Sequence, residues 1–148
     1  MKNKIPPPIL AFFCIYFIYL LKDIFPNFSF PYDEVLAFFI AFEAIVIIFF
    51  SIKEFKNVDT TISPYQLNDV SSLVTVGMFR FSRNPMYLGL TLLQLAAGFY
   101  FGNWLMIIII PMFIFYMTYF QILPEEKALF EKFGERYNKY CYKVGRWL

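Results

Sequence analysis

Long apolar runs constrain the fold of this chain more than any other feature of its sequence. Four of them can be marked, and they cover residues 9–21, 35–52, 86–101 and 104–123. A helix needs roughly 20 apolar residues to cross the hydrocarbon of a bilayer, and about 17 is near the lower limit. The fourth run meets that length clearly, whereas the first and third are marginal. We therefore predict an all-α integral membrane protein with about four transmembrane helices.

The composition agrees with a chain that contacts lipid. Hydrophobic residues make up 59% of the 148 residues and charged residues only 16%, whereas soluble domains are about half apolar and a quarter charged. We expect a single membrane domain over residues 1–148. Its expected parts are two N-terminal spans (1–52), a cytoplasmic connection (53–84), a helical hairpin (85–123) and a cytoplasmic tail helix (124–148).

The link between the third and fourth runs is very short, because it contains little more than Gly102 and Asn103. Two helices joined in this way are expected to form an antiparallel hairpin. Pro111 lies inside the fourth run. A proline is tolerated in a membrane helix and would kink it.

Basic residues predict the orientation, because lysine and arginine accumulate in the cytoplasmic parts of membrane proteins. Four spans with both termini in the cytoplasm place all of the thirteen basic residues except Lys22 on that side. The chain is thus expected to be a multi-pass protein, of the inner membrane if it is prokaryotic. Lys2 and Lys4 could also begin a signal peptide. An uncleaved anchor is favoured, since no small-residue cleavage site precedes Lys22 and Asp23.

The tail has the periodicity of an amphipathic helix. Apolar residues recur at steps of three and four between Phe130 and Trp147, and Gly134 could interrupt the helix. Such a helix would lie on the membrane surface or pack against the bundle.

Cys14 and Cys141 are expected to be free thiols. The chain has no histidine and no cluster with metal-ligand spacing, so a metal site is not expected. A nucleic-acid partner is not expected either, and the oligomeric state stays open.

The stretch RFSRNPMYLG, residues 80–89, has two interpretations. Asn84 suits the N-cap of a helix and Pro85 its first position, while Arg80 and Arg83 would anchor the chain at the membrane surface. A helix N-terminus flanked by two guanidinium groups is also an anion-binding site. The residues alone leave both interpretations open.

Acidic residues are the other candidates. Glu125 and Glu126 would open the tail helix, where the helix dipole favours them, or one of them would accept hydrogen bonds from a ligand. A hairpin returns them to the membrane face of residues 83–87, so the two segments are expected to lie close together. Glu43 lies within the second run. Because a carboxylate is costly there, it is expected to face the bundle interior or a cavity, either paired with a neighbour such as Gln94 or functional.

Four motifs occur together in the second half of the chain. They are GMFRFSRNPMYLG, E-E-x-x-L, F-G-x-x-Y-x-x-Y and a terminal V-x-R-W. With the hairpin between them, they resemble the isoprenylcysteine carboxyl methyltransferase and phospholipid methyltransferase superfamily, and most closely its small prokaryotic members. The resemblance covers about residues 73–148.

This resemblance implies a membrane enzyme that uses S-adenosylmethionine on its cytoplasmic side. The tail helix would close over the cofactor, and a lipid or another lipophilic acceptor would enter from the bilayer. The resemblance identifies no catalytic residue, and the candidates are Glu125, Glu126 and Glu43. The implied cofactor-binding residues are Arg83, Asn84, Pro85, Tyr87, Gly89, Glu125, Glu126, Tyr137 and Tyr140.

Two departures from the family pattern narrow these implications. Many members have histidine at the position of Asn84, so a general base at this position is excluded here. The prenylcysteine enzymes have an arginine just before the paired glutamates, where this chain reads YFQI at residues 119–122. A prenylcysteine carboxylate is therefore a doubtful substrate. Two other functions stay open, namely a membrane reductase that uses NADPH and a non-enzymatic scaffold whose basic tail binds anionic lipid.

Overall fold

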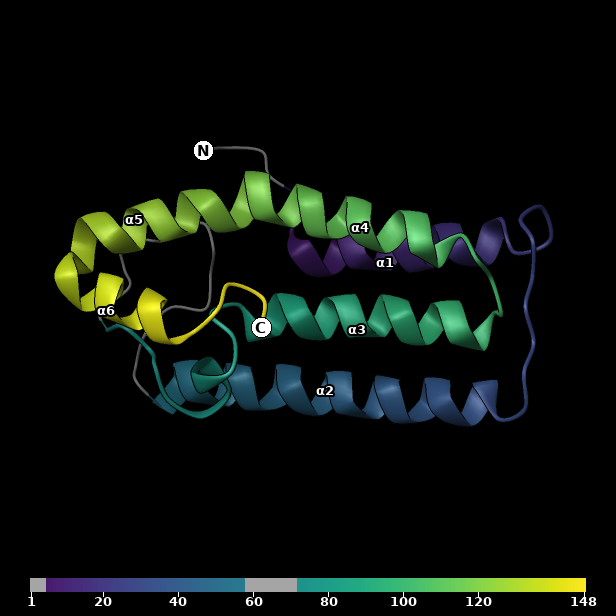
Figure 1. Ribbon diagram of the computed structural model, residues 1–148, viewed down its shortest axis with the longest axis horizontal. Coiled ribbons are helices and arrows are strands. Elements are labelled where there is room, and N and C mark those ends of the chain that lie inside the picture. Colours follow the sequence, from purple (N-terminus) through teal and green to yellow (C-terminus); the bar gives the residue numbers. More distant parts are fainter. Residues whose placement is uncertain (1–4, 58–71) are drawn as a thin grey trace. The chain divides into compact units, whose positions relative to one another are not determined.

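The computed structural model describes residues 5–57 and 72–148. Lys2, Lys4 and residues 58–71 of the expected connection lie outside the described residues. Within the described ranges the chain is helical and has no strand beyond an isolated bridge, which confirms the all-α prediction there. The elements are α1 (Pro7–Leu20), α2 (Asp33–Asn57), η2 (Gly77–Arg80), α3 (Pro85–Tyr100), α4 (Met106–Tyr116), η3 (Met117–Ile122), α5 (Leu123–Phe133) and α6 (Glu135–Lys143) (Figure 1).

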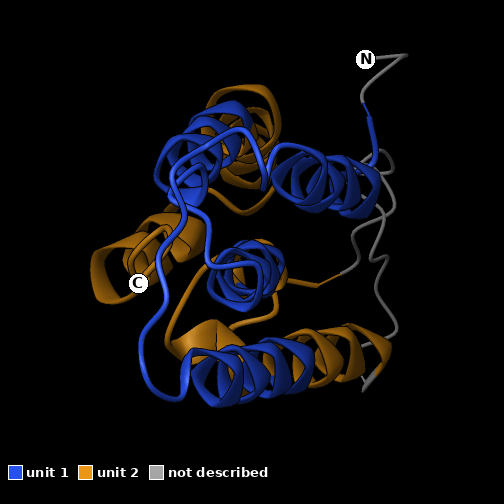
Figure 2. Cartoon of the chain, turned by 90° about the vertical axis from the view of Figure 1, so that its right-hand side faces the viewer, with its two compact units in different colours: residues 1–46, 89–116 blue, residues 47–88, 117–148 orange. Residues whose placement is uncertain are grey.

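The chain divides into two compact units (Figure 2). Unit 1 contains residues 1–46 and 89–116, and unit 2 contains residues 47–88 and 117–148. Each unit is thus assembled from stretches that are distant in the sequence, and α2 and α3 contribute residues to both.

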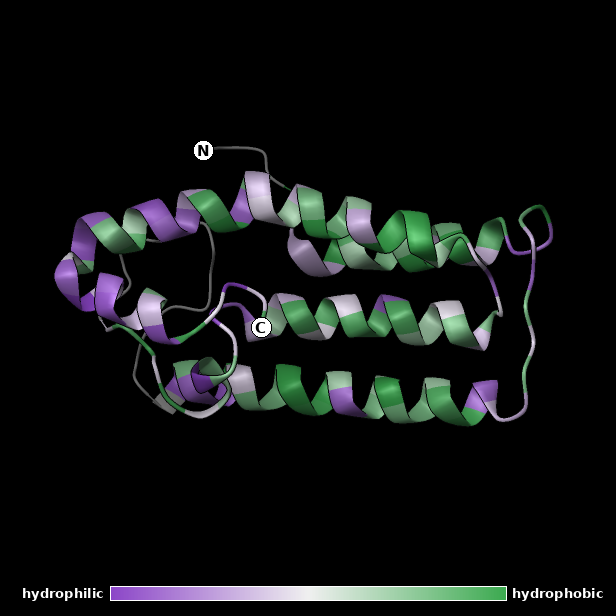
Figure 3. Ribbon diagram, in the orientation of Figure 1, coloured by the Kyte–Doolittle hydropathy of each residue, from purple (hydrophilic) through white to green (hydrophobic). Residues whose placement is uncertain are grey.

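Two helical segments are long and apolar enough to cross a membrane. They are Asp33–Lys56, with 24 residues, and Met106–Phe133, with 28. α1 and α3 are shorter, with 14 and 16 residues. α4 is largely hydrophobic and α6 largely hydrophilic (Figure 3). The second and fourth predicted runs therefore lie in helices of spanning length, and the four-helix topology stays a prediction.

The fourth run differs from its expected form at its C-terminal end. The helix does not stop there and begin again at Pro124, because it continues through the π-helical turn η3 into α5, and Ile122 itself is helical (φ −68°, ψ −49°). In a regular α-helix the ring of Pro124 would clash with the carbonyl four residues earlier, and the wider π turn lies directly before it. Glu125 and Glu126 do lie in the first turn of α5, as expected, but this turn continues from η3 and is not the start of a separate helix.

Unit 1 packs α1 beside α4 and contains the turn between α3 and α4 (Figure 1). Gly102 has φ +57°, and the side chain of Asn103 is fully buried. Asn103 Nδ2 donates to the carbonyl of Lys22 at 3.1 Å and to Asn27 Oδ1 at 3.3 Å, while its Oδ1 accepts the Leu105 N–H at 2.7 Å. The predicted turn is confirmed, and its asparagine also ties the segment after α1 to the start of α4.

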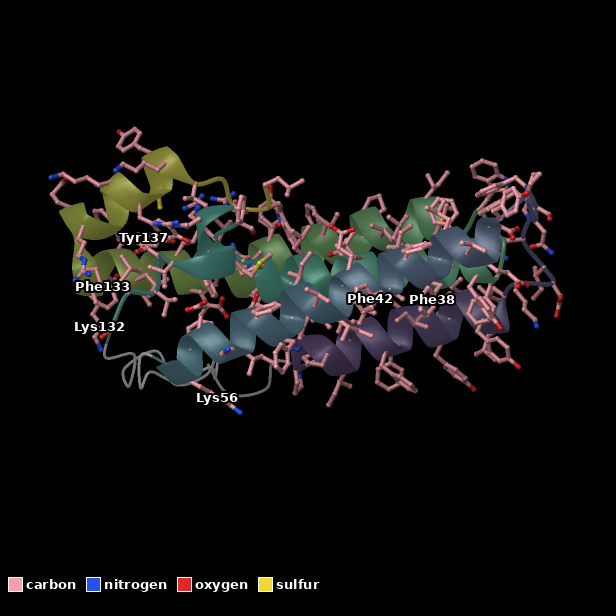
Figure 4. All side chains as sticks on the ribbon, turned by 90° about the horizontal axis from the view of Figure 1, so that it is seen from below. Phe38, Phe42, Lys56, Lys132, Phe133 and Tyr137 are labelled. Atoms are coloured by element: carbon pink, nitrogen blue, oxygen red, sulfur yellow. The ribbon has the colours of Figure 1, made fainter. Side chains whose placement is uncertain are left out.

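α2 buries a narrow stripe and exposes the rest of its surface. Phe38 and Phe42, one turn apart on this helix, are both exposed (Figure 4). Glu43 is exposed too, because it lies one residue, or about 100° around the helix, from the buried Ala44. The expectation that Glu43 faces the interior is wrong, and it forms no hydrogen bond with Gln94. The buried stripe is Ala37, Ala44, Ile47 and Ser51.

Unit 2 contains the tail, which forms two helices. Gly134 separates α5 from α6 with φ +51°, so the predicted interruption is confirmed. Leu73, Tyr137 and Tyr140 form a small buried core (Figure 4 labels Tyr137). The hydroxyl of Tyr140 donates to the carbonyl of Phe79 at 2.7 Å. The second tail helix is thereby fixed to the segment that precedes α3.

Candidate functional site

The start of α3 is built as its sequence predicts. The helix begins at Pro85, and the carbonyl of Asn84 accepts the N–H of Leu88 at 3.0 Å. The N–H of Asn84 donates to Ser82 Oγ at 3.0 Å. The amide of Asn84 has a further role, because its Nδ2 donates to the carbonyl of Arg146 at 2.9 Å. The residue therefore begins the helix and also binds the C-terminal segment.

The carboxylate of Glu126 lies between two guanidinium groups. Arg83 Nη1 is 3.1 Å from Oε1, and Arg146 donates from Nε to Oε1 at 3.0 Å and from Nη2 to Oε2 at 2.8 Å. The side chains of Arg83 and Glu126 are only 12% and 14% exposed. The hydrogen bonds to Glu126 raise the pKa of Arg146. A two-point arginine–carboxylate contact is strong and directional, so Glu126 is held in a defined position.

The neighbouring carboxylate, Glu125, is held by neutral groups. The hydroxyl of Tyr87 donates to Oε1 at 2.9 Å and lies 3.2 Å from Oε2. Gln121, one turn earlier on the helix, donates from Nε2 to the same Oε1. Tyr87 and Gln121 are both buried. The predicted proximity of residues 83–87 to the paired glutamates is thus confirmed.

The last residues of the chain cross the start of α3. The carbonyl of Gly145 accepts the N–H of Arg83 at 3.0 Å, and Trp147 Nε1 donates to Thr118 Oγ1 at 3.1 Å. Together with the contacts of Arg146, these bonds connect the terminal V-x-R-W motif to both α3 and the π turn. Unit 2 thus brings three distant parts of the sequence to one place.

Tyr137 and Tyr140 of α6 lie near enough to Arg83 for its charge to act on both phenols. Burial raises the pKa of Tyr137 and of Tyr140, and the charge of Glu126 raises that of Tyr137 further. Both phenols therefore stay protonated at neutral pH. Arg83 Nη1 also donates to the thiol sulfur of Cys141, whereas Arg83 Nε is buried and has no hydrogen-bond partner among the described residues.

We refer to Arg83, Tyr87, Gln121, Glu125, Glu126 and Arg146 as the polar network. Eight of the nine residues expected to bind a cofactor lie in unit 2, in the network or beside it. Gly89 is buried on α3 but belongs to unit 1, as does the exposed Glu43. Neither is part of the polar network.

The sequence did not single out Gln121, Cys141 or Arg146. Gln121 could have been found as a polar residue in an apolar run, one helical turn before Glu125. Arg146 belongs to the V-x-R-W motif, but its spacing gives no sign that it reaches Glu126, 20 residues earlier.

Comparison with known proteins agrees with this arrangement of motifs. The model of the phospholipid methyltransferase family matches residues 33–136. The chain belongs to the phospholipid methyltransferase family. The chain is also 47% identical over 66 residues to an uncharacterised protein of Haemophilus influenzae, a match that covers 43% of this chain and 100% of that protein. No solved structure matches. Family membership indicates methyltransferase activity and association with a membrane.

Proposed function

We propose that this phospholipid methyltransferase family member transfers a methyl group from S-adenosylmethionine to a lipid or another lipophilic small molecule. The observation that carries the proposal is the polar network of unit 2. Its two carboxylates come from α5, and its two guanidinium groups come from the segment just before α3 and from the C-terminal segment. The side chains of Arg83 and Glu126 are largely buried.

The residues present fit the chemistry of this cofactor. S-adenosylmethionine has a carboxylate, which needs N–H donors, and an ammonium and a ribose diol, which need acceptors. Arg83 supplies a buried N–H at Nε that has no described partner, and the carboxylate of Glu125 supplies acceptors. When bound, the sulfonium supplies an electrophilic methyl group, and tyrosine faces such as those of Tyr137 and Tyr140 stabilise a cation.

The two carboxylates take different roles in this proposal. Glu126 is bound by Arg83 and Arg146, so it orients the guanidinium of Arg83 and is a positioning residue. Glu125 is held by Tyr87 and Gln121, and we assign it to the ribose hydroxyls. Groups held in place in this way lower the entropic cost of aligning a donor with an acceptor. We assign no catalytic acid or base.

The neutral amide at position 121 bears on the acceptor. In the prenylcysteine enzymes, an arginine in this region meets the substrate carboxylate. Here Gln121 donates to Glu125, and it has no positive charge to offer. The proposed acceptor is therefore a lipophilic molecule that needs no cationic partner at this position.

The proposed topology has four membrane helices, a hairpin of α3 and α4, and both termini in the cytoplasm. α1 and α3, with 14 and 16 residues, rise about 21 and 24 Å at about 1.5 Å per residue. Because the hydrocarbon is about 30 Å thick, their flanking residues would complete the spans. The acceptor would enter from the bilayer, and membrane lipids would surround the chain.

Transfer of a labelled methyl group from S-adenosylmethionine into an extract of native lipids tests this function. We expect label in a lipid fraction with the wild-type chain and with Glu131→Gln, since Glu131 forms an exposed pair with Lys127. Glu125→Gln should lower the rate about tenfold or more, the cost of a charged hydrogen bond. A folded chain that transfers no label and that is protected from heat by NADPH, but not by S-adenosylmethionine, would overturn the proposal in favour of a reductase.

A further inference from the structure

Gln94 is a fully buried polar residue in the apolar helix α3. Its Nε2 donates to the carbonyl of Leu90, one turn earlier, at 3.4 Å. Its Oε1 is buried and has no hydrogen-bond partner within residues 5–57 and 72–148. A buried acceptor without a donor destabilises the fold, so it calls for a specific explanation.

Other buried polar side chains of this protein do have partners. The hydroxyl of Ser51 donates to the carbonyl of Ile47 at 2.6 Å, Asn103 uses both ends of its amide, and Gln121 donates to Glu125. In the described part of the chain, the one other buried side-chain nitrogen or oxygen without a partner is Arg83 Nε, which lies in the candidate site. Among the described residues, the unpaired oxygen of Gln94 is thus one of two exceptions, and it is the one that lies outside the candidate site.

Gln94 also continues a polar stripe along α3. Tyr87, Thr91 and Gln94 are spaced by four and three residues, which places them on one face of the helix, and all three are buried. The helix rises about 10 Å between Tyr87 and Gln94 at about 1.5 Å per residue. Gln94 therefore lies in the apolar part of α3, in unit 1.

We propose that Gln94 binds the polar end of a lipophilic ligand through a hydrogen bond from the ligand to its Oε1. A carbonyl oxygen only accepts hydrogen bonds, so the ligand must present an O–H or N–H group. Alcohols, phenols and amines on an apolar body meet this requirement, whereas ethers and esters do not. This binding site lies in unit 1 and does not depend on the proposed function.

The direction of this hydrogen bond predicts which ligands bind. An alcohol or phenol donates to Gln94 Oε1, but the corresponding methyl ether has no O–H and loses the bond. The ether is thus expected to bind more weakly than the alcohol. Selectivity for an alcohol over its methyl ether is the signature of the site.

The test uses the full-length chain in nanodiscs of phosphatidylcholine, a lipid with no O–H or N–H donor. The probes are 1-dodecanol and dodecyl methyl ether, and the readouts are the shift of the thermal midpoint and the apparent Kd. We expect the alcohol to bind about 3- to 10-fold more tightly than the ether, the worth of one hydrogen bond. Gln94→Met, similar in shape but unable to accept this bond, should bind both equally.

Ser51→Ala is the matched control, because it alters a buried polar residue whose bond is internal, and it should keep the selectivity. Equal binding of both probes by the wild type, no binding of the alcohol, or selectivity that survives in Gln94→Met would overturn the inference. Titration of the same nanodiscs with S-adenosylhomocysteine tests the proposed function separately. Selectivity without cofactor binding would retain the ligand site and reject the methyltransferase, whereas cofactor binding without selectivity would do the reverse.

Discussion

The two units differ in the kind of polar group that holds each one together. In unit 1, the buried amide of Asn103 joins backbone and side-chain groups around a turn without any charge. In unit 2, Glu126 binds two guanidinium groups, and Glu125 binds a phenol and an amide. Neutral ties are enough for a stable turn, whereas grouped charges cost desolvation and are often kept for function. The difference points to unit 2 as the place of the chemistry.

The largest effect is expected from Glu126→Ala. This change leaves Arg83, which is 12% exposed, and Arg146 without their carboxylate, and removing one partner of a buried ion pair costs about 3 kcal/mol or more. Thermal and chemical unfolding of the reconstituted chain measures the loss. Glu131→Ala is the control, because its pair with Lys127 is 79% and 65% exposed and is worth less than about 1 kcal/mol. Equal losses of stability in the two variants would show that the buried ion pairs of Glu126 contribute no more than an exposed pair.

Asn103→Ala is the corresponding change in unit 1. It leaves the N–H of Leu105 and the carbonyl of Lys22 unpaired, and each buried orphan group costs about 1–3 kcal/mol. We expect a loss of about 2 kcal/mol in the free energy of unfolding that does not change with salt, since no charge is involved. A loss that shrinks as salt is added would contradict the contrast between the units.

Tyr140→Phe is expected to cost about 1 kcal/mol, because the carbonyl of Phe79 loses its donor. The variant should also alter the pH dependence of stability. Burial raises the pKa of Tyr140, so above about pH 10 an unfolded phenol loses its proton while the folded one keeps it. This contribution is present below pH 10 and is lost as pH rises, so the variant should lose less stability in alkali. Chemical denaturation of both proteins at a series of pH values measures this difference. Parallel curves of stability against pH for the wild type and the variant would contradict it.

The smallest effect is expected from Trp147→Phe. The change keeps an aromatic ring and removes the hydrogen bond to Thr118, which is worth about 1 kcal/mol or less at a partly exposed site. We expect a slight loss of stability and, if the C-terminal segment shapes the cofactor site, weaker binding of S-adenosylhomocysteine. Binding as tight as that of the wild type would show that the contact of Trp147 with Thr118 does not contribute to the cofactor site.

Much of the fold follows from local patterns in the sequence. The apolar runs predicted the helices, Asn84 and Pro85 predicted the start of α3, and Gly134 predicted the interruption of the tail. The meeting of residues 83–87 with the paired glutamates was expected from the predicted hairpin, because a short link between two antiparallel helices brings their far ends close together.

Other features depend on contacts that no local pattern records. α2 is apolar on every side, so its sequence does not reveal which face is buried. Glu43 was therefore predicted on the buried face, whereas it is exposed. Proline normally marks the start or the end of a helix, and the π turn that carries the chain through Pro124 has no comparable signal. The bond from Arg146 to Glu126 requires the tail to fold back, which spacing alone does not predict.

The most direct test of the central claim is calorimetric titration of the purified full-length chain with S-adenosylhomocysteine. The wild type and Tyr142→Phe, which alters a residue that is 91% exposed, should both show saturable binding. Tyr87→Phe removes the hydroxyl that holds Glu125 and should bind about tenfold more weakly. No binding heat from a folded wild-type chain at high ligand concentration, or undiminished affinity in Tyr87→Phe, would contradict the assignment of the cofactor to the polar network.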